Sequence, residues 1–320
     1  MIDGYIAYLR DIRRYSPRTQ DIYRKVLEDF ALFTEGDVLD SLVPTMLRRY
    51  EADLMGRGMK PRTVHLHMSV LSGFCRYLMG KGVLSSNPAR SVKRPKMEKR
   101  LPEYYRTASM DAYFRETEHS AGEDELEILE GYGPDPSSKT AVELYRRRLR
   151  RLIISLLYDC GIRRAELIAL KVSSFDPQRE VLHVVGKGDK MREIPLIPSL
   201  CHEICLYLRA VESMGGGVRP AGDPLLVTEK GHPLYPVYVD RAVKAELDGA
   251  GITGRKSPHV LRHSVATALL DGGTDLNSIK EMLGHASLAA TQVYTHNSVD
   301  RLKKVYNLAH PRAKNGGSND

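Results

Sequence analysis

Apolar residues recur every three or four positions through the first eighty residues, which is the period of one buried face of an α-helix. One row begins after Ser16-Pro17, where serine suits the N-cap and proline suits the first helical position. Another row follows Pro61 and continues to Gly80. The pattern predicts helices over residues 2–14, 17–36, 44–56 and 61–80. Four short helices joined by short loops are typical of a small helical bundle.

Two later segments lack a helical pattern. Residues 85–103 are rich in proline, lysine and arginine, and we expect an extended basic linker that contacts phosphate if the partner is a nucleic acid. A solvated hinge is the alternative interpretation. Residues 116–139 are acidic and contain glycine, proline and serine, a composition that predicts a partly disordered surface excursion. It is interpreted as a tolerated loop insertion or, alternatively, as a segment for regulation or partner binding.

The rest of the chain mixes helical rows with one short sheet. A β-branched run at 181–185 predicts a strand, and 191–196 is the return strand after a glycine-containing turn. Helices are predicted over residues 140–160, 164–170, 198–213, 236–249, 259–271, 275–283, 287–295 and 298–308. We expect a loose polar tail after Pro311. The predicted fold class is therefore mainly α with a small β-sheet (α+β).

An arginine cluster marks the first half of the helix predicted over residues 140–160. Acidic residues lie near it in sequence, so we interpret it as a solvated face rather than a DNA-binding stripe. The cluster consists of Arg146, Arg147, Arg148, Arg150 and Arg151.

Charge is unevenly placed along the 320 residues, whose net charge is +8. Residues 1–100 contain 19 Lys and Arg against 11 Asp and Glu, whereas residues 101–320 contain 29 of each sign. A basic first third suits a polyanion, and nucleic acid is the first candidate. No stretch approaches the roughly 20 apolar residues of a membrane span, and the first residues lack a signal-peptide pattern, so we expect a cytoplasmic protein without membrane contact.

Several residues near the C-terminus suggest phosphate chemistry. Ser257-Pro258 predicts a helix start, which places His259 and Arg262 in the first turn, where backbone N–H groups favour an anion. A guanidinium matches phosphate oxygens bidentately. A capping cluster on a surface helix is the alternative. His259 and His263 also have the spacing of a zinc pair, but the zincin pattern needs Glu at the position of Val260, and the four cysteines form no metal pattern. No metal or other cofactor is expected.

Two cations upstream could join this set. Arg163 opens a helix after a glycine, and Glu166 is placed to hold its guanidinium. Lys187 lies in a glycine-flanked hairpin turn, where it could reach a phosphate or protonate a departing oxygen. Lys190 in the same turn is the runner-up. An ordinary solvated turn lysine is the alternative.

The candidate nucleophile is Tyr294, nine residues after His285. A phenol with a pKa near 10 is a poor nucleophile at neutral pH unless cations stabilise its oxyanion. Displacement at a phosphodiester builds negative charge on oxygen, and fixed arginines can stabilise that charge where a metal otherwise would. Taken alone, as one of 17 tyrosines, Tyr294 would be interpreted as a core or interface residue.

The order of these residues resembles the tyrosine recombinase (phage integrase) family, in particular its Xer-type members. The similarity covers nearly the whole chain. It is carried by five segments: Gly161-Ile-Arg-Arg-Ala-Glu-Leu167, Val184-Val-Gly-Lys-Gly-Asp-Lys-Met-Arg-Glu-Ile-Pro-Leu196, Ser257-Pro-His-Val-Leu-Arg-His-Ser-Val-Ala-Thr267, Leu283-Gly-His-Ala-Ser-Leu-Ala-Ala-Thr-Gln-Val-Tyr-Thr-His296 and His310-Pro-Arg-Ala313. The acidic segment 116–139 is longer than its Xer counterpart.

The resemblance implies a domain organisation and a set of roles. Residues 1–84 would be a helical core-binding (SAM-like) domain that clamps DNA, 85–103 the basic linker, and 104–320 the catalytic domain. Tyr294 would form a 3′-phosphotyrosyl ester, and Lys187 would protonate the 5′-oxygen. Arg163 and Arg262 would hold the transition state. His285 would hydrogen-bond the phosphate, and His259 would assist proton transfer at Tyr294.

The resemblance also implies partners and a biological role. The substrate would be double-stranded DNA carrying a recombination site, bound by a tetramer of this chain or of this chain and a paralogue. The last helix, about 298–308, would dock on a neighbouring subunit. Chromosome dimer resolution through a Holliday junction is the leading expectation, in which an activating cell-division protein could take part. A mobile-element integrase, a non-catalytic DNA-binding factor and a relaxing topoisomerase are the alternatives.

Overall fold

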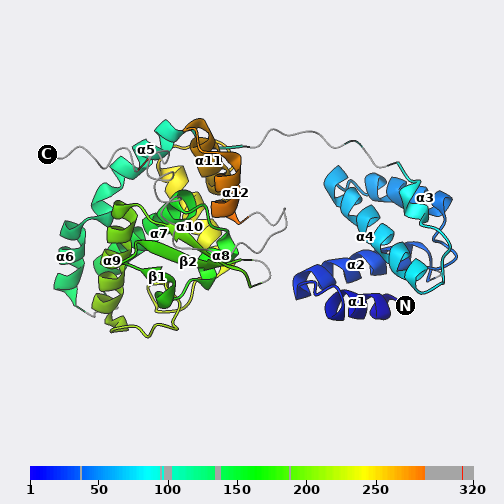
Figure 1. Cartoon of the computed structure of the whole chain (residues 1–320), viewed down its shortest axis with the longest axis horizontal. Helices are drawn as coiled ribbons and strands as arrows, with labels where there is room; N and C mark the ends of the chain where they lie inside the picture. The colour runs from blue at the N-terminus through cyan, green and yellow to red at the C-terminus, as the bar shows by residue number, and fades with distance from the viewer. Residues whose placement is uncertain are drawn as a thin grey trace. The chain divides into compact units, whose positions relative to one another are not determined.

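A computed structural model of the chain describes residues 1–36, 38–93, 96, 103–133, 138–186, 189–284 and 312. The chain divides into two compact units, Met1–Leu101 and Pro102–Asp320. Each unit has its own hydrophobic core, and helices dominate both (Figure 1). The second unit adds one small antiparallel sheet, which confirms the predicted fold class. Among the helices of the described ranges, none combines the length and apolarity of a membrane span.

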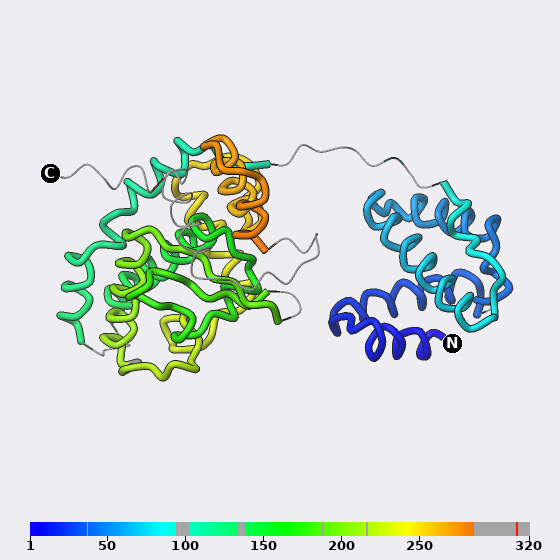
Figure 2. The backbone as a smooth tube through the Cα atoms, in the orientation of Figure 1, coloured from blue at the N-terminus to red at the C-terminus, as the bar shows by residue number. Residues whose placement is uncertain are grey.

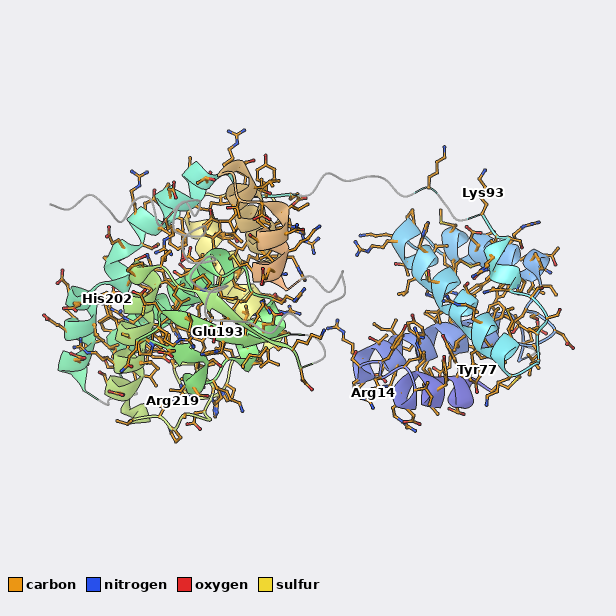
Figure 3. The ribbon with its side chains drawn as sticks, in the orientation of Figure 1. Arg14, Tyr77, Lys93, Glu193, His202 and Arg219 are labelled. Carbon is orange, nitrogen blue, oxygen red and sulfur yellow. The ribbon has the colours of Figure 1, made fainter. Side chains whose placement is uncertain are left out.

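The first unit is a bundle of four helices, as the periodicity predicted. Ser16 caps the second helix by accepting a hydrogen bond from the Thr19 backbone N–H. Phe74 and Tyr77 of the last helix lie against the Tyr5 ring of the first, and Tyr77 is labelled in Figure 3. The bounds are α1 (Ile2–Asp11), α2 (Pro17–Phe33), α3 (Pro44–Gly56) and α4 (Pro61–Gly80).

The chain after α4 remains packed on the first unit for longer than the predicted linker allows. A 3₁₀ turn, η1 (Pro88–Arg90), follows Asn87, whose side-chain amide donates to the Ser72 carbonyl at 3.0 Å. Ala89 and Val92 are buried in the core of this unit. The predicted start of an extended linker at residue 85 therefore differs from the structure, because small apolar residues between the charged ones provide a face that the bundle buries.

The residues just beyond the other end of the predicted linker pack within the second unit. The Tyr105 backbone N–H donates to Ser264 Oγ at 2.8 Å, and the Tyr105 hydroxyl donates to the Arg255 carbonyl at 2.7 Å. Residues 94–95 and 97–102, which fall within the predicted linker, lie outside the described residues.

The second unit surrounds a three-stranded sheet of order β1-β2-β3 with helices. The predicted hairpin is confirmed: β2 and β3 pair antiparallel, with Val184 opposite Arg192. The helices predicted over 287–295 and 298–308 lie outside the described residues. The elements are α5 (Thr107–Glu116), η2 (Glu118–Ala121), α6 (Glu123–Tyr132), α7 (Lys139–Asp159), α8 (Arg164–Ala169), η3 (Val172–Ser174), β1 (Phe175–Asp176), β2 (Val181–Val185), β3 (Met191–Pro195), α9 (Pro198–Val211), the π-helical turn η4 (Glu212–Gly216), α10 (Pro236–Gly249), α11 (Pro258–Asp271) and α12 (Leu276–Leu283).

Helix α7 is the central element of this unit. It packs against α9, α10 and α11, and the tube in Figure 2 follows it through the middle of the unit. Its C-terminal half is fully buried from Leu152 to Asp159, and the preceding Arg151 is 3% exposed. Because α7 leads directly into Gly161 and Arg163, the best-packed helix of the unit positions the first candidate site residue.

The described part of the acidic segment, residues 116–133 and 138–139, is folded, contrary to the prediction of a partly disordered surface excursion. Within its described residues, η2 and α6 pack on α7 and α9, and Leu126 and Leu129 are buried. Glu125 accepts a hydrogen bond from Arg147, and Glu130 pairs with Arg209 at 3.0 Å. The composition was misleading because these acidic residues are neutralised by arginines that are distant in sequence.

The arginine cluster of α7 is correspondingly not a solvated face. Arg148 is 1% exposed and donates to the backbone carbonyls of Ala121 and Gly122. Arg151 is also buried and pairs with Glu203 at 2.5 Å. Arg146 and Arg147, which are partly exposed, pair with Glu229 and Glu125. The cluster and the acidic segment therefore compensate each other across the fold.

At Arg312 the structure differs from the expectation of a loose tail after Pro311. Its guanidinium forms an ion pair with Asp159, the last residue of α7, and lies 3.8 Å from the centre of the Phe114 ring. Asp159 is fully buried, and burial raises its pKa to about 7 even though the Arg312 charge opposes the shift. The fold thus anchors this part of the C-terminal segment on the second unit.

We predict that Leu126→Ala destabilises the second unit by about 2–5 kcal/mol, because it leaves a cavity in a core position. Ile128→Ala is the matched control on the same helix: this side chain is 56% exposed, and its loss should cost no more than about 0.5 kcal/mol. Urea unfolding of the full chain, followed by circular dichroism, measures both. Equal small effects would restore the interpretation of the segment as a surface excursion.

Candidate functional site

Arg163 lies at the N-cap of α8, where a left-handed Gly161 (φ +57°) turns the chain away from α7. Its Nη1 donates to Glu166 Oε1 at 2.7 Å, and its backbone N–H donates to Glu166 Oε2 at 2.9 Å. The predicted contact between this arginine and Glu166 is confirmed. The second terminal nitrogen, Nη2, donates to the Gly284 carbonyl at 3.1 Å. Glu166 therefore fixes the guanidinium beside the residue that precedes His285.

Arg262 enters the same region from the first turns of α11. The predicted helix start is confirmed, since Ser257 Oγ accepts from the Val260 N–H. The Arg262 side chain is buried, and its terminal nitrogens donate to the backbone carbonyls of Gly161 and Leu283. Both acceptors are neutral, so this guanidinium has no carboxylate partner in these contacts.

The electrostatics of Arg262 reflect an excess of positive charge. Burial and, after it, the charges of Arg163 and Arg192 together lower the pKa of its guanidinium to about 10, against the opposing effect of Glu166. Three guanidiniums thus face a single carboxylate. An anion bound among them would relieve the mutual repulsion of the cations, which is the electrostatic requirement for a phosphate site.

Arg192 is the residue that sequence reasoning missed. It lies on β3, is 5% exposed, and donates from Nη2 to Glu166 Oε2 at 2.8 Å and from Nε to the Met282 carbonyl at 2.9 Å. The sequence signal that could have identified it was the alternation of inward and outward positions along the predicted strand. Val184 across the strand pair and Ile194 two residues on are both fully buried, so an arginine on that face requires internal partners.

His259 lies one turn before Arg262 but is exposed. Its pKa is lowered, first by partial burial and then by the positive charges of His263, Arg164, Arg262 and Arg255. A lowered pKa keeps the imidazole neutral at neutral pH, so His259 is able to accept a proton.

Lys187, His285 and Tyr294 lie outside the described residues. The residues that precede the first two are described, and both lie at the arginine cluster. A Cβ atom built on Gly186 would lie 3.5 Å from Arg192 Nη1 and 3.8 Å from Glu166 Oε1. The Gly284 carbonyl accepts from Arg163. The structure therefore brings together Arg163, Arg262 and the chain segments that lead to Lys187 and His285.

The arrangement suits electrostatic catalysis at an anion. The arginines emerge from a helix start, a strand and a second helix, each backed by the core, so their positions are fixed before any ligand binds. Within the described ranges, no three His, Cys, Asp or Glu side chains gather as metal ligands.

Comparison with known proteins identifies relatives over the whole chain. Residues 141–301 match the model of the phage integrase family, and residues 2–82 match the phage integrase N-terminal SAM-like domain. Tyrosine recombinase XerC of Chlorobaculum parvum is 33% identical over 98% of this chain and 94% of its own length. XerC of Pelobacter propionicus is 35% identical over 98% of this chain and 96% of its own length.

Solved structures share the fold at low sequence identity. The site-specific recombinase XerH bound to a palindromic difH substrate superposes with a TM-score of 0.64 and 22% identity, covering 95% of this chain and 82% of that one. A λ integrase dimer bound to a COC′ core site superposes with a TM-score of 0.61 and 18% identity, covering 92% of this chain and 98% of that one.

We predict that Gly161→Ala is more destabilising than Gly251→Ala. Both glycines have a positive φ, so each substitution costs about 1–2 kcal/mol of backbone strain. Only at Gly161 would the new Cβ lie 2.5 Å from Leu283 Cδ2, whereas nothing lies within 4 Å at Gly251. The collision should add about 1–3 kcal/mol. Thermal unfolding of the two variants measures the difference, and equal losses would show that α12 does not pack on this turn.

Proposed function

This chain belongs to the phage integrase family of tyrosine recombinases, and we propose that its arginine cluster holds the phosphate that Tyr294 attacks. The observation that carries this proposal is the convergence of Arg163 and Arg262 on the end of α12. Both guanidiniums donate to backbone carbonyls there, and the next residue is His285. A phosphate oxygen is a stronger acceptor than a carbonyl, so a scissile phosphate would take over these donors.

The first step exchanges one phosphate ester for another. The Tyr294 oxygen attacks phosphorus and loses its proton to His259, whose neutral imidazole is able to accept it. The bond from phosphorus to the 5′-oxygen breaks, and a 3′-phosphotyrosyl ester forms. Arg163 and Arg262 stabilise the negative charge that develops on the non-bridging oxygens, assisted by a hydrogen bond from His285.

The leaving 5′-oxygen takes a proton from Lys187. The position of Gly186 against Arg192 and Glu166 supports this role, because it places the start of the turn at the cluster. The 5′-hydroxyl of a partner duplex then attacks the phosphotyrosyl ester and regenerates Tyr294. Each exchange conserves the number of ester bonds, so no ATP is needed to drive it, and the arginines stabilise the charge that a metal would otherwise stabilise.

The substrate class is double-stranded DNA with a recombination site. The basic residues of the first third supply the charge for a clamp around the duplex. We further propose a tetramer on two sites, composed of this chain alone or with a paralogue, that passes through a Holliday junction. The similarity to XerC proteins favours chromosome dimer resolution, with a cell-division protein as an activator. A mobile-element recombinase is the second candidate and uses the same chemistry.

We predict that Tyr294→Phe abolishes the covalent protein–DNA adduct on a nicked duplex that carries the cognate site. The substitution removes only the nucleophilic oxygen, so binding in a gel shift should persist. Tyr235→Phe removes a hydroxyl from an exposed tyrosine and should leave adduct formation unchanged. Adduct formed by Tyr294→Phe would assign the nucleophile to another residue.

Affinity for DNA should fall steeply as salt rises. A protein that makes about six to ten phosphate contacts loses roughly 10³–10⁵ in affinity between 50 and 200 mM salt. The double variant Lys60→Gln/Arg62→Gln, at the start of α4, should make the slope of log affinity against log salt concentration shallower by up to about 0.9 per lost contact. Lys230→Gln/Arg241→Gln is the matched pair on the second unit, and all four side chains are exposed. A flat profile, or equal effects of the two pairs, would contradict a clamp built on the first unit.

A further inference from the structure

Arg192 lies against three of the described segments that lead into the proposed catalytic site. Its guanidinium makes two hydrogen bonds to Glu166, at 2.8 and 3.3 Å, and its Nε donates to the Met282 carbonyl. A Cβ atom on Gly284 would lie 3.1 Å from Arg192 Nη1 and 3.2 Å from its Cζ, so the backbone passes directly over the guanidinium. Gly186 approaches the same group. One side chain therefore contacts α8, the end of α12 and the turn that contains Lys187.

Each of the three guanidinium nitrogens makes one hydrogen bond to the protein. Nε, Nη1 and Nη2 all donate to Glu166 or to Met282, and the side chain is nearly completely buried. Arg163 differs, because its side chain is 35% exposed. Arg192 is consequently unsuited to contact substrate and well suited to hold the groups that do.

We propose that Arg192 is a positioning residue for strand cleavage: it fixes Glu166, and through it Arg163, and it fixes the end of α12 from which His285 follows. The inference rests on the proposed function of this site. Without Arg192, Glu166 would keep the single partner Arg163 in this network, and the Met282 carbonyl would lose its buried donor. Arg163 and the residue after Gly284 would then no longer be fixed relative to each other.

The hydrogen bonds from Arg192 and Arg163 change the pKa of Glu166, and an experiment can detect this effect. Burial tends to raise the pKa of Glu166, but hydrogen bonds from Arg192 and Arg163 outweigh burial and leave the pKa below its usual range. The described charged groups around it are Arg163 at the start of α8, Arg192 on β3 and Arg262 on α11. On the side of α8 towards α10, Arg164 pairs with Asp240. Removal of Arg192 leaves burial opposed by fewer cations, so the pKa of Glu166 rises.

The test compares the rate of adduct formation in Arg192→Gln and wild type across pH 5.5 to 8.5, at saturating protein on a nicked duplex. We expect the variant to be about 10²-fold slower at high pH, the size expected for a small misplacement of catalytic groups. The ratio of variant to wild type should fall further as pH drops, because Glu166 becomes protonated and releases Arg163. DNA affinity should not change.

Three further variants separate this role from general destabilisation. Glu166→Gln/Arg192→Gln has no titrating carboxylate at position 166, so the ratio of its rate to the wild-type rate should not vary with pH. Arg192→Lys keeps a cation beside Glu166 and should also give a pH-independent ratio, at a rate between those of Arg192→Gln and wild type. Arg179→Gln is the control. It breaks an ion pair of 3.0 Å to Glu193, which neighbours Arg192 on β3 and is labelled in Figure 3, and it should retain the wild-type rate.

The outcomes distinguish this inference from the proposed function. Wild type that forms no adduct would overturn the function itself. An adduct that depends on Tyr294, with Arg192→Gln as fast as wild type or slower by a factor independent of pH, would overturn only the role of Arg192. If Arg192→Gln does not fold, as judged by circular dichroism, Arg192→Lys decides: a wild-type rate would refute the need for the guanidinium.

Discussion

The second unit depends on one buried carboxylate. Glu166 accepts hydrogen bonds from Arg163 and Arg192, and it is the only carboxylate among the described contacts of the three clustered guanidiniums. Like charges at this separation repel strongly in a medium of low dielectric constant. Glu166 offsets enough of that repulsion for the cations to remain charged in the folded protein, yet it leaves an excess of positive charge. That excess is what a phosphate would neutralise.

The fold divides its arginines into two groups by the kind of acceptor they meet. On α7, Arg146, Arg147 and Arg151 pair with carboxylates, which retain them. In the cluster, Arg262 donates only to backbone carbonyls in the described contacts. A carbonyl is a weaker acceptor than an anionic oxygen, so an incoming anion can displace it with a gain in free energy. The same residue type is structural in one place and available to a ligand in the other.

The backbone at the site is shaped by close approach. Gly161 and Gly284 both adopt positive φ, and a side chain at either would meet Leu283 or Arg192. The end of α12 consequently rests directly on the α7–α8 turn and on the guanidiniums. The negative end of the α12 dipole adds to their stabilisation, since the helix carbonyls point at the cations. Helix end and arginine cluster therefore stabilise each other.

Sequence by itself determined the local elements and the chemistry of the motifs. Periodicity and capping residues located the helices of the first unit, the β2–β3 hairpin and the start of α11, and the spacing of Arg163 and Glu166 indicated their contact. These signals depend on neighbours within a few residues. Tertiary structure alone decided the folding of the acidic segment, the burial of Arg148 and Arg151, and the part of Arg192, because the carboxylates and carbonyls that these side chains bind come from segments up to about ninety residues away in the chain. Whether a charged side chain is solvated or buried depends on such partners, and a local pattern does not contain them.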